Sequence, residues 1–425
     1  MKLVIVRIPY GDSEQEVEIQ DERLLAYVQP KLPKPLQDPG KSIIEALKNP
    51  IGAKSLQELL DGAKKVALVT DNFARPTRYQ KVLPPLIREV EKAGAEPLII
   101  IANGGLRQTT QKELMIKLGE KILNSGIKII QNIKNRTEEY EFIGLTSAGT
   151  PVCINKEYHE SDVKIGIHTC QMTLWGYGGG GSIVLPGVSM SETIEWNHRF
   201  GISEGSLTPG YVGEKNILRK DIDEAARLSN ISNIVNFVLN PKGEILYTSA
   251  GGVDLSFKDA IKEFDKIYSY TLREGQKADI AIGGAFKWDK YLAHACWGIS
   301  TLNPITRDNG TIIIVAPCHG GLAHFSFIKE YMPPNMENLR RLLMDVFYLE
   351  QELWHVILWY PIYMIMMKKN VIVVTEEKNH EALKNLGIFA TTSLEEAYEK
   401  ASSKYGPNAK VIVAPYSKWA KPIFD

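Results

Sequence analysis

Short apolar segments alternate with amphipathic helical segments along most of this chain, and this alternation limits its fold more than any other feature. KKVALVTD at residues 64–71 is a buried-strand pattern, and an amphipathic helical pattern follows at 79–95. EPLIIIANGG at 96–105 begins the next unit, and Thr110 is placed to cap the helix after it. Strands and helices at this spacing predict βαβ units and a parallel sheet.

The same alternation returns in the C-terminal part, where strands are predicted at 278–284, 310–318, 370–377 and 409–416. The stretch 256–277 has the pattern of a long connecting helix. We therefore predict an α/β protein with two Rossmann-like domains, parallel sheets and a cleft between them. The expected division is 1–270 and 271–425, and the last strand could belong to either domain.

Composition narrows the partners and the compartment. Lys and Arg together number 50, as do Asp and Glu, so no basic excess indicates nucleic acid or an anionic membrane. The four cysteines form no CxxC pair, which argues against a zinc knuckle or a disulfide framework and fits the cytoplasm. The N-terminal segment alternates like a strand and has no signal-peptide pattern. The apolar run at 353–367 is too short to span a membrane, where about 20 residues are needed, so we expect it to be buried.

The loops that follow the predicted strands are where a parallel sheet binds ligands. Glycine recurs in four of the five loops considered, which lie at 71–78, 103–110, 178–181, 282–289 and 316–324. Glycine lets backbone N–H groups approach an anion, so a phosphate or nucleotide is suggested. The GxGxxG pattern is absent at the first strand–helix turn and no P-loop pattern occurs, which disfavours a standard dinucleotide or P-loop site.

WGYGGGGSIVLPG at 175–187 holds the most unusual of these loops. Its four glycines, Gly178, Gly179, Gly180 and Gly181, are followed by Ser182 and then by a predicted helix, SETIEWNH. We expect Ser191 to cap that helix and His198 to lie about two turns into it.

These segments resemble the nickel-dependent lactate racemase family. GGGGSIVLPG followed by WNH fits the family's Gly-Gly, Ile-x-Pro-Gly and Asn-His spacing. DNFARPT resembles its Asp-x-Thr-Arg-Pro loop through Arg75, and NGGLRQTT resembles its Gly-Thr-His-Arg-Pro-x-Thr loop through Arg107. GGAFKWD and NGTIIIVAPC resemble its C-terminal strands. The resemblance covers most of the chain.

The resemblance implies a cofactor and a reaction. The family's cofactor is a nickel-pincer nucleotide, whose metal is held by one carbon, two sulfurs and a single protein histidine, which falls on His198. A base removes the hydroxyl proton of a 2-hydroxy acid while the α-hydride moves to the cofactor and back. By resemblance, Asn72 and the segment Gly178 to Ser182 would bind the cofactor, and Arg75, Arg107 and Trp297 the substrate. Cofactor-synthesising enzymes are the implied partners.

The chain also departs from the family at functional positions. The lysine that can link the cofactor falls on Ser182, so we expect non-covalent binding. The family's two acid–base histidines fall on Leu106 and Met172, neither of which can carry a proton. A Gln and a Lys near the substrate fall on His294 and Trp297.

Three hypotheses remain open from the sequence. The first is an active racemase or epimerase of a 2-hydroxy acid that uses other bases, with His168, His294 and His319 as the candidates. The second is a binding homologue without turnover. The third is an NAD-type oxidoreductase, which the missing fingerprint loop disfavours.

Overall fold

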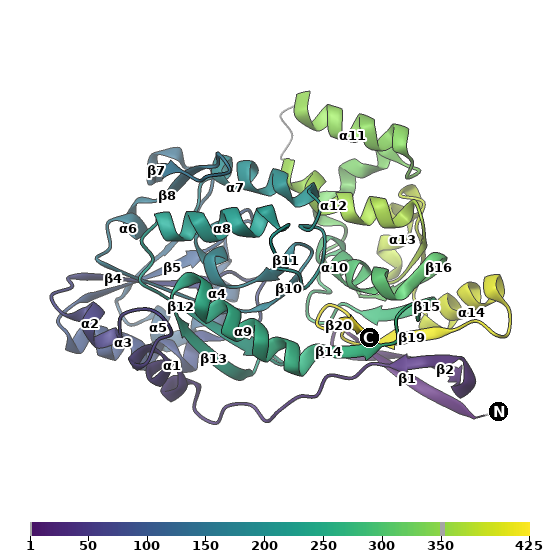
Figure 1. Ribbon diagram of the computed structural model, residues 1–425, viewed down its shortest axis with the longest axis horizontal. Coiled ribbons are helices and arrows are strands. Elements are labelled where there is room, and N and C mark those ends of the chain that lie inside the picture. Colours follow the sequence, from purple (N-terminus) through teal and green to yellow (C-terminus); the bar gives the residue numbers. More distant parts are fainter. Residues whose placement is uncertain (1, 349–352) are drawn as a thin grey trace.

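A computed structural model of the protein has two domains that lie side by side, each built around a largely parallel sheet (Figure 1). The structure describes residues 2–348 and 353–425, except for the side chains at 324–327 and 346–355. The predicted α/β class with two parallel sheets is confirmed.

The first sheet is built from the N-terminal βαβ units. Its order is β13-β12-β9-β4-β5-β6, and β13 alone runs antiparallel to its neighbour. The strands are β4 (Lys65–Asp71), β5 (Glu96–Ala102), β6 (Lys128–Gln131), β9 (Val163–Thr169), β12 (Asn233–Leu239) and β13 (Ile245–Gly251). Both faces of β4 are buried, because Val66 and Leu68 enter one core and Ala67 and Val69 another. Strands buried on both faces are continuous apolar runs, which is why KKVALVTD is recognisable in the sequence.

Helices cover both faces of this sheet. One face carries α1 (Pro39–Lys48), α3 (Leu83–Lys92), α4 (Gln111–Leu118) and α9 (Val253–Tyr268). The other carries α6 (Lys156–His159), α7 (Ser191–His198) and α8 (Ile217–Leu228). Thr110 caps α4 as predicted, through a reciprocal capping box with Glu113. The prediction for α7 is wrong: Met190 is its N-cap residue, and no side chain caps the helix.

The second sheet contains a strand from the beginning of the chain. Its order is β18-β17-β16-β15-β19-β3. The strands are β3 (Leu24–Tyr27), β15 (Ala278–Gly284), β16 (Thr306–Val315), β17 (Asn370–Val374), β18 (Phe389–Thr391) and β19 (Val411–Ala414). β3 extends the sheet by pairing in parallel with β19, which itself pairs with β15. The expected 1–270 domain is therefore corrected, because its first residues belong with the second sheet. No local pattern marks a pairing between strands almost 400 residues apart.

A hairpin of β1 (Leu3–Tyr10) and β2 (Ser13–Gln20) covers one face of the second sheet together with α14 (Leu394–Tyr405). It lies beside β15 and β19, and the chain then runs along the lower edge of the molecule to α1 in the first domain (Figure 1). Ile8 is fully buried there, and a methyl group added at Gly284 of β15 would come within 2.7 Å of its Cγ2 atom.

The opposite face of the second sheet is covered by α10 (Leu292–Leu302), α12 (Leu353–Met366) and α13 (His380–Asn385). This core is continuous with the core under α7 and α8, so one hydrophobic cluster joins the two domains. The described side chains of α12 are largely buried in it, as expected for the apolar run, and α11 (Met336–Tyr348) packs on α12. Within the described residues, no helix is long and apolar enough to cross a membrane.

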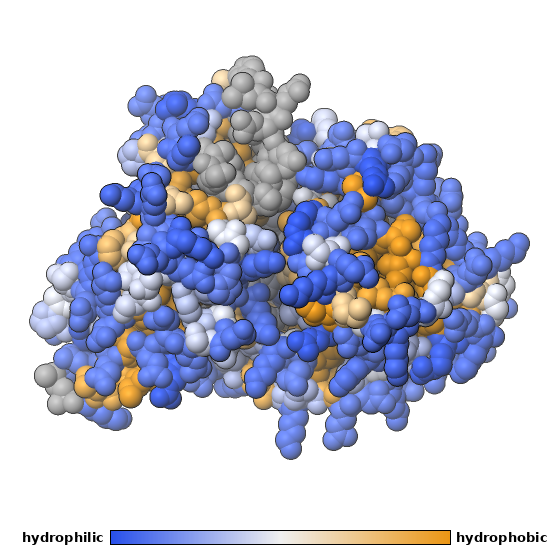
Figure 2. All heavy atoms as spheres, turned by 180° about the vertical axis from the view of Figure 1, so that it is seen from behind, coloured by the Kyte–Doolittle hydropathy of each residue, from blue (hydrophilic) through white to orange (hydrophobic). Residues whose placement is uncertain are grey.

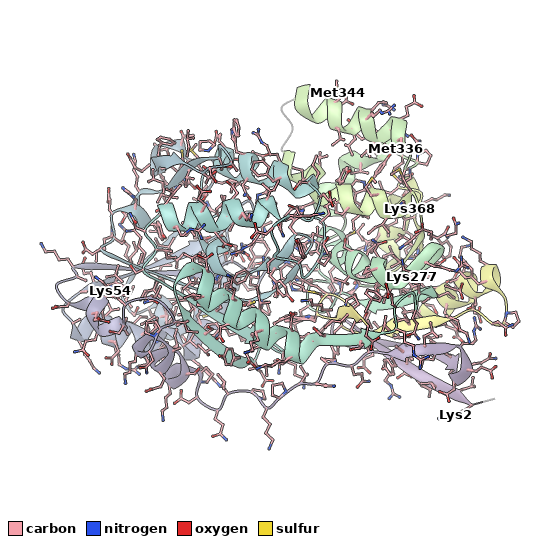
Figure 3. All side chains as sticks on the ribbon, in the orientation of Figure 1. Lys2, Lys54, Lys277, Met336, Met344 and Lys368 are labelled. Carbon is pink, nitrogen blue, oxygen red and sulfur yellow. The ribbon has the colours of Figure 1, made fainter. Side chains whose placement is uncertain are left out.

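The segment between the domains differs from the predicted long helix. α9 ends at Tyr268, and β14 (Ser269–Leu272) follows and pairs with β20 (Lys421–Phe424) near the C-terminus. The outer surface is mostly hydrophilic when seen from behind, with apolar residues gathered in patches (Figure 2). The exposed residues Lys2 and Lys54 lie at opposite ends of the long axis (Figure 3).

Replacing Ile8 with alanine should lower the free energy of unfolding by about 2–4 kcal/mol, because it leaves a cavity between the hairpin and β15. The matched control is Ile5→Ala on the same strand, whose side chain is 48% exposed. That change should stay within about 0.5 kcal/mol. Denaturant unfolding of both variants measures the difference, and equal losses would contradict the packing described here.

Candidate functional site

A large cavity lies where the two domains meet, at the carboxyl ends of β4, β5 and β9. It encloses about 1160 Å³, its open mouth included. The first domain supplies most of the wall, and the second contributes Trp288, Ala293, His294, Trp297 and Leu358. Apolar walls with a few polar groups are typical of small-molecule sites.

A buried ion pair shapes the loop that follows β4. Lys117 Nζ of α4 donates to Asp71 Oδ1 at 2.7 Å, and also to the carbonyl oxygens of Arg75 and Thr77 at 3.1 and 3.2 Å. The Thr77 hydroxyl donates to Asp71 Oδ2 at 2.7 Å. Asn72 holds the neighbouring loop by donating to the carbonyl oxygens of Ala102 and Asn103. The loop is therefore fixed from inside, with Asn72 and Arg75 lining the cavity.

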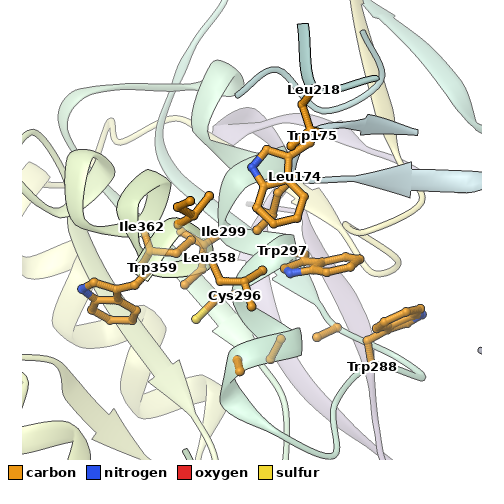
Figure 4. Close-up of a cluster of buried hydrophobic side chains, with 14 of the residues drawn as sticks. Leu174, Trp175, Leu218, Trp288, Cys296, Trp297, Ile299, Leu358, Trp359 and Ile362 are labelled. Atoms are coloured by element: carbon orange, nitrogen blue, oxygen red, sulfur yellow. The ribbon is translucent and has the colours of Figure 1, made fainter. Parts of the chain in front are cut away.

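Arg75 faces two tryptophans of the second domain. Its guanidinium carbon lies 4.5 Å from the centre of a Trp288 ring and 6.0 Å from that of Trp297, and the two indoles stack at 5.0 Å. Trp175, Trp297 and Trp288 follow one another along the cluster (Figure 4). Burial lowers the pKa of Arg75 to about 10, so the side chain stays charged at neutral pH.

His198 lies at the end of α7 and lines the cavity, with its ring edge-on to Trp175 at 5.2 Å. The side chain is buried, and burial lowers its pKa to about 4 despite the opposing effect of the Ile194 carbonyl. A neutral imidazole is the form that binds metals. The described residues contain no group of three or more His, Cys, Asp or Glu side chains that could hold a metal ion.

Two further predicted histidines reach the cavity and one does not. His168 lies next to the last residue of β9 with its Nε2 buried and unpartnered, and burial lowers its pKa to about 3. His294 enters from α10, edge-on to Trp288 at 5.4 Å. His319 lies outside the cavity, and its Nδ1 pairs with Glu376.

Arg107 also lies away from the cavity wall. Its guanidinium makes a two-pronged ion pair with Glu113 at 2.9 and 2.7 Å and covers the Phe73 ring. The side chain therefore stabilises the start of α4 in this structure. Leu106, next to it, does line the cavity, whereas Met172 does not.

The glycine run is packed against the protein itself, which corrects the expectation that it wraps a ligand. A Cβ added at Gly180 would lie 2.7 Å from the Phe257 ring of α9 and 2.8 Å from Arg219 of α8, and one at Gly179 would lie 2.8 Å from the same ring. Gly181 is similarly close to α8. Of the run, Gly178 and Ser182 line the cavity.

The backbone N–H groups of this run are partly occupied as well. Gly179 donates to Ser182 Oγ at 3.0 Å, and Gly180 donates to Asn236 Oδ1 at 2.7 Å. The prediction that these groups converge on a cofactor anion is therefore wrong for Gly179 and Gly180. The glycines are needed because two helices approach the loop.

Several residues of the site were not predicted. Arg219 of α8 lines the cavity, donates to the carbonyl oxygens of Tyr177 and Gly179, and pairs with Asp223. Trp288 belongs to the predicted loop at 282–289, but its stacking partner, Trp297, lies on α10. Nothing local distinguishes Arg219 from a surface residue of an amphipathic helix, so only the packing against the glycine run reveals its place.

Comparisons with known proteins agree with this architecture. The family model of the lactate racemase N-terminal domain matches residues 10–208, and that of the lactate racemase C-terminal domain matches residues 273–417. The lactate racemase of Thermoanaerobacterium thermosaccharolyticum is 28% identical over 96% of this chain and 97% of its own. That of Lactiplantibacillus plantarum is 27% identical over 88% and 89%.

The fold agrees as closely. The solved structure of the lactate racemase apoprotein from Thermoanaerobacterium thermosaccharolyticum superposes with a TM-score of 0.89 at 26% identity, covering 99% of this chain and 100% of that one. A Thermotoga maritima protein shares the fold, with a TM-score of 0.69 at 18% identity over 91% and 99%. The site thus belongs to a two-domain isomerase. The chain is a member of the lactate racemase family, as the motifs predicted.

Gly180→Ala should destabilise the whole protein, and its effect should not be limited to weaker ligand binding at the site. Gly180 has a φ of +53° and no room for a methyl group, so strain and overpacking together should cost about 3 kcal/mol or more. Gly62→Ala is the matched control, because Gly62 has a φ of +72° but nothing within 4 Å. It should cost only about 1–2 kcal/mol. Thermal or denaturant unfolding compares the two, and equal stability losses would show that the contacts with Phe257 and Arg219 do not matter.

Proposed function

We propose that this protein racemises or epimerises a 2-hydroxy acid, with a nickel-pincer nucleotide held non-covalently in the cavity between the domains. The observation that carries the proposal is His198, a buried imidazole on the cavity wall whose pKa is lowered by burial; the described residues contain no cluster of three or more metal-binding side chains. One imidazole is a poor nickel site alone, which fits a metal brought by an organic cofactor.

The residues present fit that group in two respects. His198 would hold the nickel, and Asn72 and Ser182 lie on the cavity wall where they could contact the nucleotide. Lysine does not occur among the described residues that line the cavity, so no amine is placed for a covalent link. When bound, the cofactor would supply the hydride acceptor.

Substrate binding falls to Arg75 and the apolar wall. Arg75 can hold a carboxylate with its planar fork of donors, and it has no carboxylate partner among the described residues. The walls formed by Trp175, Trp297 and Leu358 would exclude water from the reacting carbon.

His294 is the histidine that we propose accepts the proton from the substrate hydroxyl. It reaches the cavity from the second domain, beside the tryptophans that Arg75 faces. His168 is a weaker candidate, because a group with a pKa of about 3 is a poor base at neutral pH. His319 would not take part from its position beside Glu376.

His198→Ala should abolish nickel loading when the chain is produced together with cofactor-synthesising enzymes. Loss of the one protein ligand should lower nickel per chain by about tenfold or more. The conversion of single-enantiomer 2-hydroxy acids, followed by chiral chromatography, should disappear with it. His159→Ala, which removes an exposed histidine, is the control and should load normally. An unmutated chain that takes up no nickel under these conditions would overturn the proposal and favour a binding homologue or an NAD-type enzyme.

Denaturing mass spectrometry of the loaded protein should give the mass of the bare chain. Ser182 cannot form the amide-like bond that a lysine side chain allows, so unfolding should release the cofactor. Native mass spectrometry of the same sample is the control and should show the complex. A covalent adduct that survives denaturation would contradict non-covalent binding.

A further inference from the structure

One buried lysine at the domain junction lacks a hydrogen-bond acceptor, unlike the others. Four lysines are buried among the described residues: Lys117, Lys164, Lys369 and Lys418. Lys117 pairs with Asp71, Lys164 donates to a carbonyl oxygen at 2.8 Å, and Lys369 donates to three oxygens of Asn303 and Thr306. Lys418 is 3% exposed, and its Nζ has no partner. Buried polar groups in native proteins are nearly always satisfied, so a missing partner needs an explanation.

Lys418 lies against the aromatic wall of the cavity. Its Nζ is 2.6 Å from the centre of the Trp288 ring and 4.8 Å from that of Trp297, and both indoles line the cavity. Arg75 faces the same two rings from the first domain. Two cations from different domains therefore share one pair of indoles. The faces of the indole rings offset part of the positive charge, but they are much weaker hydrogen-bond acceptors than a carboxylate.

The local charge is not balanced by the protein. Neither Arg75 nor Lys418 forms an ion pair with a carboxylate in the part of the chain that the structure describes, whereas the nearby Asp71 is already paired with Lys117. Burial, with repulsion from Arg75 added, lowers the pKa of Lys418 well below its usual value. An anion placed between Arg75 and Lys418 would offset both the cost of burying the Lys418 charge and the repulsion between the two side chains.

We propose that Lys418 is a second carboxylate-binding residue, which with Arg75 holds one carboxylate of the ligand across the domain junction. The identification of that carboxylate as belonging to a 2-hydroxy acid rests on the proposed function. The flexible stem of Lys418 lets its ammonium group leave the face of Trp288 and meet the carboxylate at the cavity wall. Because the two cations belong to different domains, the bound carboxylate also ties the domains together.

The test measures binding of 2-hydroxyisobutyrate to the full chain by tryptophan fluorescence. This hydroxy acid has no α-hydrogen, so it cannot turn over, and Trp288 and Trp297 report on the site directly. Lys418→Met should weaken binding by about 30-fold or more, and Lys418→Arg should retain much of the affinity. Lys400→Met, which removes an exposed lysine lying 4.3 Å from the Phe389 ring, is the matched control and should bind normally. The neutral amide of the same acid should bind weakly to every variant.

Stability gives a second readout that a structural lysine would not produce. Removing an unpartnered buried amine should leave the melting temperature of the ligand-free protein unchanged or raise it. Weaker carboxylate binding together with an undiminished melting temperature supports the proposal. If Lys418→Met has a lower melting temperature than the unmutated protein, the Lys418→Arg variant decides. Retained carboxylate affinity in Lys418→Arg supports the proposal, and lost affinity in both variants overturns it. Unchanged affinity in Lys418→Met also overturns it. These outcomes do not depend on nickel or turnover, so they are separate from the test of the proposed function.

Discussion

The buried ion pair between Asp71 and Lys117 fixes the part of the structure on which the site depends. It gathers the end of β4, the start of the following loop and α4 around one ammonium group, which also donates to two carbonyl oxygens of the loop. Such a pair adds little net stability, but breaking it by removing one partner typically costs about 3–5 kcal/mol. Its consequence here is geometric, because a loop held at Asp71 and Thr77 has Arg75 directed at the second domain.

The second domain can complete the cavity because the two domains share a core. The cluster that contains α7 and α8 continues into α10 and α12, and strands from both ends of the chain lie in the second sheet. The N-terminal hairpin and β3 are therefore part of the support for β15, whose following loop carries Trp288. Contacts far from the cavity therefore help to position the Trp288 indole on the cavity wall.

Burial then decides what each polar group at the site can do. His198 and His168 both lose affinity for protons because they are enclosed, which suits a metal ligand and disfavours a base. Leu106 adds to the apolar wall. Arg75 lines the cavity and Lys418 lies against Trp288 of its wall, and neither has a carboxylate partner among the described residues, which supports the proposal that the site binds an anion.

The sequence by itself determined the α/β class, the main strands of both sheets, the cap at Thr110 and the family, because these depend on periodicity and short motifs. Of the site residues that it proposed, Asn72, Arg75, His168, His198, His294 and Trp297 line the cavity in the structure. Only the tertiary structure decided that β3 joins the second sheet, that Phe257 and Arg219 require the glycines, and that Arg107 and His319 lie elsewhere. Lys418 likewise looks ordinary in the sequence. These outcomes depend on contacts between residues far apart in the chain, and spacing along a sequence carries no record of which distant surfaces pack together.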